Sequence, residues 1–270
     1  MSPGRKDFPA VRACIFDLDG LLINSEDKIT NSVNKLLTKY GRPTITREIR
    51  VQLMGVPDST SSDVFHNWAK LPIAREQFNR ELRDEMNAQF VTCEPLPGAE
   101  YLLTNLNRAR SSSGNAIGLA LASSTSTSTY KLKSSMPETK RLLDLFPTNL
   151  RVLGDDPRVR EGRGKPAPDI YWVALEALDR AIQPEECLVF EDSVAGVEAG
   201  RRAGMRVVWV PHPDVAAEWQ GGAKEVLAGR TGTSRLGDEW QLGEIDDGWA
   251  ESISSLEHFD YGKYNLHLSS

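Results

Sequence analysis

Short runs of apolar, β-prone residues alternate with helical stretches along this chain, and this alternation limits the possible folds more than any other feature. The runs span residues 11–16, 116–122, 151–153, 187–190 and 207–210. Strands separated by helices are typical of a parallel sheet with helices on both faces. We therefore predict an α/β protein with a doubly wound parallel sheet, a Rossmann-like core.

Residues 25–93 interrupt this alternation after the first run. Apolar residues recur there at helical spacings, as in Phe78, Leu82, Met86 and Phe90, and no strong strand pattern appears. We predict a small helical cap domain over 25–93, inserted into a core made of residues 10–24 and 94–212.

The last segment, residues 213–270, is predicted to be an acidic C-terminal extension, since it holds 11 Asp or Glu against 4 Lys or Arg. It also contains Trp219, Trp240 and Trp249. Spaced tryptophans favour packing on the body, whereas a long acidic tail favours disorder. A docked extension and a partner-binding segment both stay open.

The net charge and the number of cysteines limit the kinds of binding partner and the cellular compartment that we expect for this protein. The net charge of −6 argues against a nucleic-acid partner, because such proteins usually carry a basic face. The apolar runs are far too short for a membrane span. Three widely spaced cysteines, Cys14, Cys93 and Cys187, argue against a disulfide framework, so we expect a cytoplasmic protein.

Polar side chains follow four of the predicted strands. They are Asp17 and Asp19 after the first, Ser123 and Ser124 after the second, Lys165 beyond the third, and Glu191 and Asp192 after the fourth. Ligands of parallel α/β sheets bind beyond the carboxyl ends of the strands. We therefore expect these side chains to meet in one site.

The sequence Asp17–Leu18–Asp19–Gly20 offers two carboxylates on a loop that Gly20 allows to turn. One carboxylate can serve as a nucleophile and metal ligand, and the other as a general acid and base. A plain acidic turn is the alternative. A calcium loop would need a third Asp and a downstream Glu, whereas Leu21 and Leu22 follow here.

The remaining polar groups suit a phosphate and a hard cation. Lys165 can neutralise phosphate oxygens, and the Ser123 hydroxyl with its neighbouring amides can bind them. Asp192 would complete an oxygen-only site of the kind that Mg²⁺ prefers. Taken singly, each of these residues is more often a solvated Lys, a turn Ser or a helix-starting acid.

The order and the residues of these motifs resemble those of the haloacid dehalogenase-like hydrolase superfamily. Its four motifs are similar to FDLDG, the serines after the second strand, GKPAPD and FEDS in this chain. The helical insert looks like the cap of the phosphoglucomutase-like phosphatases of that superfamily. DGLLINSE, GKPAPDIY and FEDSVAGVEAGRRAGM resemble the pseudouridine-5′-phosphatase-like branch most. The resemblance covers residues 11–211.

This resemblance implies a Mg²⁺-dependent phosphatase with an aspartyl-phosphate intermediate. Asp17 would be the nucleophile, and Asp19 the acid and base. Ser123, Ser124 and Lys165 would bind the substrate. Asp17, Asp192 and the backbone carbonyl of Asp19 would hold the metal, with Glu191 in outer contact.

The resemblance also separates related chemistries. Asp19 argues against a dehalogenase, and Ile29, where β-phosphoglucomutases carry a cap histidine, argues against a phosphomutase. Many relatives have Asp at the position of Asn24, which bears on cap closure. A phosphomutase and a non-catalytic binding protein on the same scaffold remain alternatives.

The implied substrate is a small phosphomonoester. A nucleoside monophosphate such as pseudouridine 5′-phosphate is the first candidate, and a sugar or polyol phosphate the next. The sequence leaves the oligomeric state open.

Overall fold

The computed structural model describes residues 8–53, 58–231 and 243–268. The described residues form a parallel six-stranded sheet in the order β3-β2-β1-β4-β5-β6. Its strands are β1 (Ala13–Phe16), β2 (Gly118–Ala122), β3 (Arg151–Val152), β4 (Cys187–Glu191), β5 (Arg206–Trp209) and β6 (Ala250–Ser252). The predicted doubly wound α/β fold is confirmed.

Side chains alternate between the two faces of this sheet, because successive residues of a strand point in opposite directions. Both faces are buried, so the strands read as continuous apolar runs. On one face, Phe16, Leu121 and Phe190 pack against α5 (Ala99–Arg108) and α7 (Pro137–Leu143). The Phe16 and Phe190 rings stack with centroids 4.5 Å apart.

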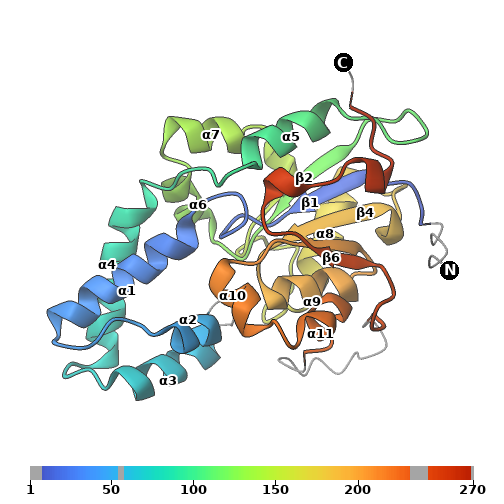
Figure 1. Cartoon of the computed structure of the whole chain (residues 1–270). Coiled ribbons are helices and arrows are strands. Elements are labelled where there is room, and N and C mark those ends of the chain that lie inside the picture. The colour runs from blue at the N-terminus through green and yellow to red at the C-terminus, as the bar shows by residue number, and fades with distance from the viewer. Residues whose placement is uncertain (1–7, 54–57, 232–242, 269–270) are drawn as a thin grey trace.

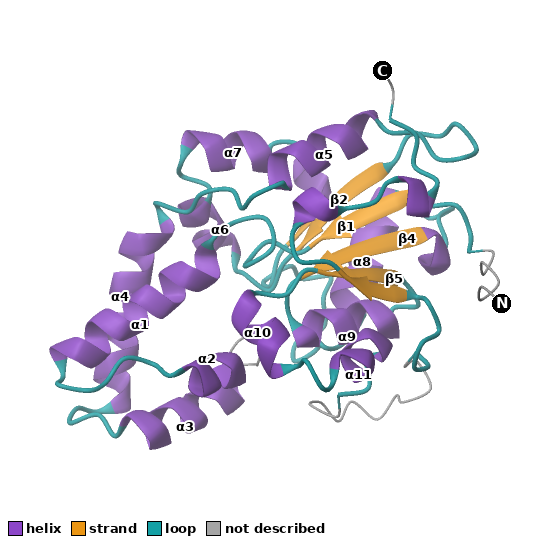
Figure 2. Cartoon of the chain, in the orientation of Figure 1, coloured by secondary structure: helices purple, strands orange, loops and turns teal. Residues whose placement is uncertain are grey.

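The other face holds a second apolar layer in which Ile15, Val189 and Val207 pack against helices α8 and α9. Figure 2 shows the sheet between these two helical layers. The elements on this side are α8 (Asp169–Leu178), α9 (Val194–Arg202), α10 (Pro213–Glu218) and α11 (Ala223–Ala228). Ser193 caps α9 by accepting a hydrogen bond from the Gly196 backbone amide.

Four helices between β1 and β2 form a separate lobe beside the carboxyl ends of the strands (Figure 1). They are α1 (Ser25–Lys39), α2 (Arg47–Leu53), α3 (Asp58–Ala69) and α4 (Arg75–Phe90). Val33, Leu37, Phe65 and Phe78 make a small apolar core of their own. A short helix of the core, α6 (Thr127–Lys133), contacts α4 where the two lobes meet.

The described part of the C-terminal segment belongs to the body of the protein. β6 pairs with β5, and the residues after it supply Leu256, Phe259, Tyr264 and Leu266 to the core. Trp219 packs beside the second apolar layer, and Trp249 packs edge-on against Phe8. Trp240 lies outside the described residues. The described part of this segment is therefore docked on the core.

Candidate active site

The two acidic motifs meet where the strand order reverses. From β1 the chain first builds β2 and β3 on one side, and then β4, β5 and β6 on the other. Asp17 follows β1, whereas Glu191 ends β4 and Asp192 follows it. A parallel sheet opens a crevice at the carboxyl ends of such neighbouring strands. The expected meeting of these acids is thus a consequence of topology.

The loop after β1 turns sharply over Asp192. Gly20 has a φ of +75°, and a Cβ at this position would lie 2.2 Å from Asp192 Oδ2. Any side chain would therefore be strained and would also clash with the carboxylate. The predicted need for a glycine in this turn is confirmed.

Lys165 lies buried at the centre of the acidic group. Its Nζ donates to Asp17 Oδ1 at 2.5 Å, to Glu191 Oε1 at 2.6 Å and to the Ala122 carbonyl at 3.0 Å. These three acceptors use all three N–H bonds of the ammonium group. Burial opposes the charged form, but Asp17 and Glu191 outweigh it and raise the pKa of Lys165.

Three carboxylates crowd this buried site. Oxygens of Asp17, Glu191 and Asp192 lie within 4.8 Å of one another. Burial, with added repulsion from Glu191 and Asp19, raises the pKa of Asp17 to about 7 although Lys165 opposes the shift. Burial and the charges of Glu191 and Asp17 raise the pKa of Asp192 well above its usual range. Like charges confined at a buried site favour a bound cation.

The three acids are not equivalent as metal ligands. Glu191 Oε1 accepts from Lys165 and from the Tyr171 hydroxyl at 2.7 Å. Its Oε2 accepts from the Asp192 amide at 3.0 Å and from the amide and hydroxyl of Ser193. Its acceptor sites are therefore filled by protein donors.

Asp192 differs, because no donor among the described residues hydrogen-bonds to its carboxylate oxygens. Asp17 Oδ2 is likewise without a donor in the described part of the chain, since only Oδ1 meets Lys165. Two buried carboxylates with open oxygens fit a hard cation such as Mg²⁺. Glu191 fits the outer, supporting position.

Asp19 faces away from this triad toward the junction with the helical lobe. Its Oδ1 accepts from Ser25 Oγ and from Lys133 Nζ, both at 2.5 Å, and its Oδ2 lies 3.4 Å from Ser123 Oγ. Ser123 is fully buried, and its hydroxyl also accepts from the Thr125 amide at 3.2 Å. The structure thus brings Asp19 and Ser123 together.

Ser124 does not join this group. Its side chain is exposed, and within the described residues no hydrogen bond links it with the acids or the lysines. Lys133 and Tyr171, in contrast, belong to the site although sequence reasoning did not select them. Tyr171 lies in the motif GKPAPDIY, whereas Lys133 follows a Ser/Thr-rich run and has no motif of its own.

The two lobes are joined at a paired hinge. The backbone amide of Asn24 donates to the Glu94 carbonyl at 3.1 Å, and the backbone amide of Glu94 donates to the side-chain Oδ1 of Asn24 at 2.9 Å. An aspartate at this position would accept the same hydrogen bond. Asn24 therefore preserves the hinge contact.

A second contact between the lobes connects α2 with α10. Arg50 donates to Asp214 at 2.9 Å and to Asp27 at 2.6 Å, and its guanidinium lies 3.4 Å from His212 Nε2. His212 Nδ1 accepts from the Asp214 amide at 3.1 Å. Partial burial and the charge of Arg50 lower the pKa of His212. This charged cluster holds the helical lobe against the core at the place where α2 lies beside α10 (Figure 1).

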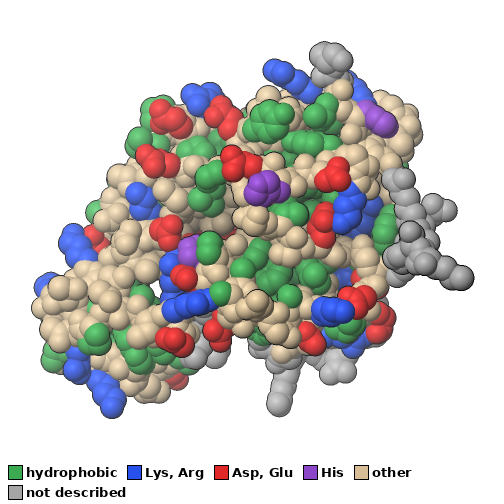
Figure 3. Space-filling view, in the orientation of Figure 1, with side chains coloured by type: hydrophobic (Ala, Val, Ile, Leu, Met, Phe, Trp, Pro, Cys, Tyr) green, Lys and Arg blue, Asp and Glu red, His purple; other side chains and the backbone are tan. Residues whose placement is uncertain are grey.

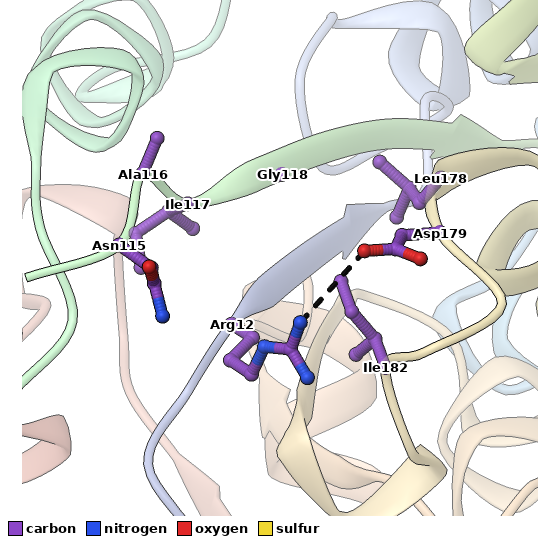
Figure 4. A pocket seen from close by; sticks show the side chains of 8 residues that line it. All are labelled: Arg12, Asn115, Ala116, Ile117, Gly118, Leu178, Asp179 and Ile182. Atoms are coloured by element: carbon purple, nitrogen blue, oxygen red, sulfur yellow. Dashed lines mark ion pairs between the residues drawn. The ribbon is translucent and has the colours of Figure 1, made fainter. Parts of the chain in front are cut away.

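A hollow of about 330 Å³ lies at the opposite end of the sheet, where β1 and β2 begin. Figure 4 shows Arg12 reaching Asp179 across it, an ion pair of 3.7 Å. It contains none of the predicted site residues.

The surface gives no support to a nucleic-acid partner on the face in Figure 3, because basic and acidic side chains are interspersed over it. None of the helices in the described ranges has the length and apolar character that crossing a bilayer requires.

Comparison with known proteins agrees with this architecture. The family model described as haloacid dehalogenase-like hydrolase matches residues 14–210. A Saccharomyces cerevisiae protein named "Probable pseudouridine-5′-phosphatase" is 36% identical over 266 residues, which are 95% of this chain and 98% of that protein. The Arabidopsis thaliana "(DL)-glycerol-3-phosphatase 1, mitochondrial" is 32% identical, over 86% of this chain and 74% of that protein.

Among solved structures, a Deinococcus radiodurans haloacid dehalogenase family hydrolase with bound phosphate and sodium has a TM-score of 0.60. It is 27% identical, and the match covers 81% of this chain and 96% of that chain. The chain therefore belongs to the haloacid dehalogenase-like hydrolase family and is one of its phosphatases.

Proposed function

We propose that this phosphatase hydrolyses a small phosphomonoester through a covalent phosphate on Asp17, and that it requires Mg²⁺. The observation that supports this most is the meeting of Asp17, Asp192 and Lys165 at one buried site, with Asp19 beside it. A nucleophile, an open pair of carboxylates and a buried cation are the parts that in-line phosphoryl transfer needs.

The first half-reaction uses Asp17 as nucleophile. A carboxylate oxygen bonds to phosphorus while the bond from phosphorus to the leaving alcohol oxygen breaks, which gives an aspartyl phosphate. Lys165 donates to Asp17 Oδ1 and so fixes the orientation of the attacking carboxylate. The ammonium group also offsets the negative charge that gathers on the phosphoryl oxygens.

Asp19 carries the proton in both halves. It gives a proton to the leaving alcohol and later removes one from the water that attacks the aspartyl phosphate. Water attack regenerates Asp17 and releases inorganic phosphate. The buried Ser123 hydroxyl and the neighbouring amides orient the phosphoryl group from the side of β2.

Asp17, Asp192 and the backbone carbonyl of Asp19 would hold Mg²⁺. When bound, the ion supplies charge neutralisation and orientation at the phosphoryl oxygens. Glu191 stays outside the ligand set, since its oxygens already accept from Lys165, Tyr171 and the start of α9.

The proposed substrate class is a nucleoside monophosphate, with pseudouridine 5′-phosphate first and polyol phosphates such as glycerol 3-phosphate next. The yeast relative supports the first choice, because its match covers nearly the whole of both chains. A phosphomutase is disfavoured because Ile29 packs beside the apolar cores and cannot transfer a proton.

The test is the release of inorganic phosphate from pseudouridine 5′-phosphate, other nucleoside monophosphates, and sugar and polyol phosphates, with Mg²⁺ and with excess EDTA. We expect release from one compound class, its loss in EDTA, and its loss in Asp17→Asn. Asp179→Asn is the matched control, since Asp179 is an exposed carboxylate at the far end of the sheet.

Any of three results would contradict the proposal. Full activity of Asp17→Asn would remove the nucleophile from the mechanism. An isomer without free phosphate would identify a phosphomutase, and no turnover of any compound would favour a binding protein.

A further inference from the structure

A second buried lysine lies in the site and has no part in the mechanism described so far. Lys133 is the last residue of α6, and its side chain is only 4% exposed. Its Nζ donates to Asp19 Oδ1 at 2.5 Å and to Thr125 Oγ1 at 3.0 Å. It also lies 4.5 Å from the ring centroid of Phe90, at the end of α4.

A buried ammonium group is costly unless an opposite charge compensates it. The compensating charge here is Asp19, which is the sole carboxylate within ion-pair distance of Lys133 among the described residues. Each of the two buried lysines thus forms an ion pair with one aspartate of the first motif. Lys165 holds Asp17, and Lys133 holds Asp19.

The contacts of Asp19 distinguish its two oxygens. Oδ1 receives two short hydrogen bonds, from Ser25 of α1 and from Lys133 of α6. Oδ2 receives one long contact of 3.4 Å from Ser123, on the side where the phosphoryl group would bind. A carboxylate held by one oxygen keeps a fixed orientation and presents the other.

We propose that Lys133 is the positioning residue for proton transfer to the leaving group. It anchors Asp19 through Oδ1, so that Oδ2 faces the leaving oxygen and carries the proton. This inference rests on the proposed function, in which Asp19 is the acid and base. Lys133 itself touches neither phosphorus nor the leaving group.

The leaving group makes this role measurable. Departure of an alcohol, as from pseudouridine 5′-phosphate or glycerol 3-phosphate, requires a proton from Asp19. p-Nitrophenolate departs as an anion and depends little on that proton. A residue that acts through Asp19 therefore affects alkyl phosphates selectively, whereas loss of fold or of phosphate binding affects both substrates alike.

The test compares Lys133→Met with wild type on the best alkyl phosphate and on p-nitrophenyl phosphate. Because general acid catalysis contributes about 10²–10⁴-fold, we expect kcat on the alkyl phosphate to fall at least about tenfold. On p-nitrophenyl phosphate we expect a fall of less than about threefold, with KM for both substrates nearly unchanged. Lys131→Met, an exposed lysine of the same helix, should match wild type.

A double mutant tests whether the effect passes through Asp19. In an Asp19→Asn background, Lys133→Met should cause no further loss, because residues that act as a unit are not additive. Lys133→Gln, which keeps a polar group in the buried position, gives the same comparison if the Met variant does not fold.

The inference fails if both substrates lose activity equally, if the loss lies in KM, or if the losses from Asp19→Asn and Lys133→Met add. The Asp17→Asn variant distinguishes a failure of the proposed function from a failure of the role proposed for Lys133. An active Asp17→Asn would overturn the proposed function, whereas an inactive Asp17→Asn with a normal Lys133→Met would overturn the role of Lys133 alone.

Discussion

Replacing Asp192 with Asn should abolish activity and yet make the metal-free protein more stable. Oxygens of Asp17 and Glu191 lie within 4.8 Å of a carboxylate oxygen of Asp192, and Lys165 is the one buried cation that pairs with this triad in the described residues. Asn has the same shape as Asp but no charge. The substitution therefore removes repulsion without leaving a cavity.

The size of the effect follows from Coulomb's law. At an effective dielectric constant of about 20, two unit charges at this separation repel by about 3 kcal/mol. Asp192 has two such neighbours, and attraction to Lys165 offsets roughly one of them. Burial and the charges of Glu191 and Asp17 raise the pKa of Asp192, so protonation relieves part of the remainder. We expect Asp192→Asn to raise the free energy of unfolding by about 1–2 kcal/mol in EDTA.

Urea unfolding in EDTA and in Mg²⁺ is the assay. Mg²⁺ at about 100 times its dissociation constant should stabilise the wild type by about 2.7 kcal/mol. The variant, which lacks one of the proposed ligands, should gain much less, so the order of stability should reverse. Asp179→Asn should shift little in either condition. The reasoning is refuted if Asp192→Asn is less stable than wild type in EDTA.

Two further substitutions test the support of the site and the contact between the lobes. Gly196→Ala would place a Cβ 1.9 Å from the Glu191 carboxylate, so we expect a destabilisation of about 2 kcal/mol or more and a large fall in kcat. Gly221→Ala, which meets nothing within 4 Å, is the control, and equal effects of the two would contradict the argument. His212→Asn should remove a stability loss that wild type shows as pH falls below about 6.5. Because the pKa of His212 is lowered in the folded state, the unfolded chain binds a proton at a higher pH than the folded chain does. The difference between the thermal unfolding temperatures at pH 7.5 and 5.5 should therefore be smaller in the variant. An unchanged difference would contradict this role of His212.

The position of the proposed catalytic group could be predicted from the sequence because topology determines it. Strand ends of a parallel sheet share one edge, so Asp17, Lys165 and Asp192 could be grouped before any contact was known. The polarity of each position was sufficient, and no side-chain geometry was needed.

Lys133 could not be predicted in the same way. The direction in which the Lys133 side chain points depends on where α6 starts after the Ser/Thr-rich run. A helix boundary is uncertain by one or two residues, and a shift of about two residues turns a side chain to the opposite side of the helix. A lysine in a polar segment also resembles an exposed one. Only the packing of α6 against α4 shows that it is buried.

The sequence pattern does not predict β6 either, for a different reason. Ala250–Ser252 is three residues long and carries no apolar alternation. Its pairing with β5 depends on the apolar residues that follow it, such as Leu256 and Phe259, which dock on the core. Tertiary contacts rather than local preference make this strand.

The most direct test of the central claim is to look for phosphate on Asp17 itself. The enzyme would be mixed with Mg²⁺ and its best substrate, quenched in acid within the first turnover, digested, and analysed by mass spectrometry. We predict one phosphoryl group on the peptide that contains Asp17, and none in Asp17→Asn. Rapid phosphate release with phosphate on no peptide, or on a different residue, would contradict the account.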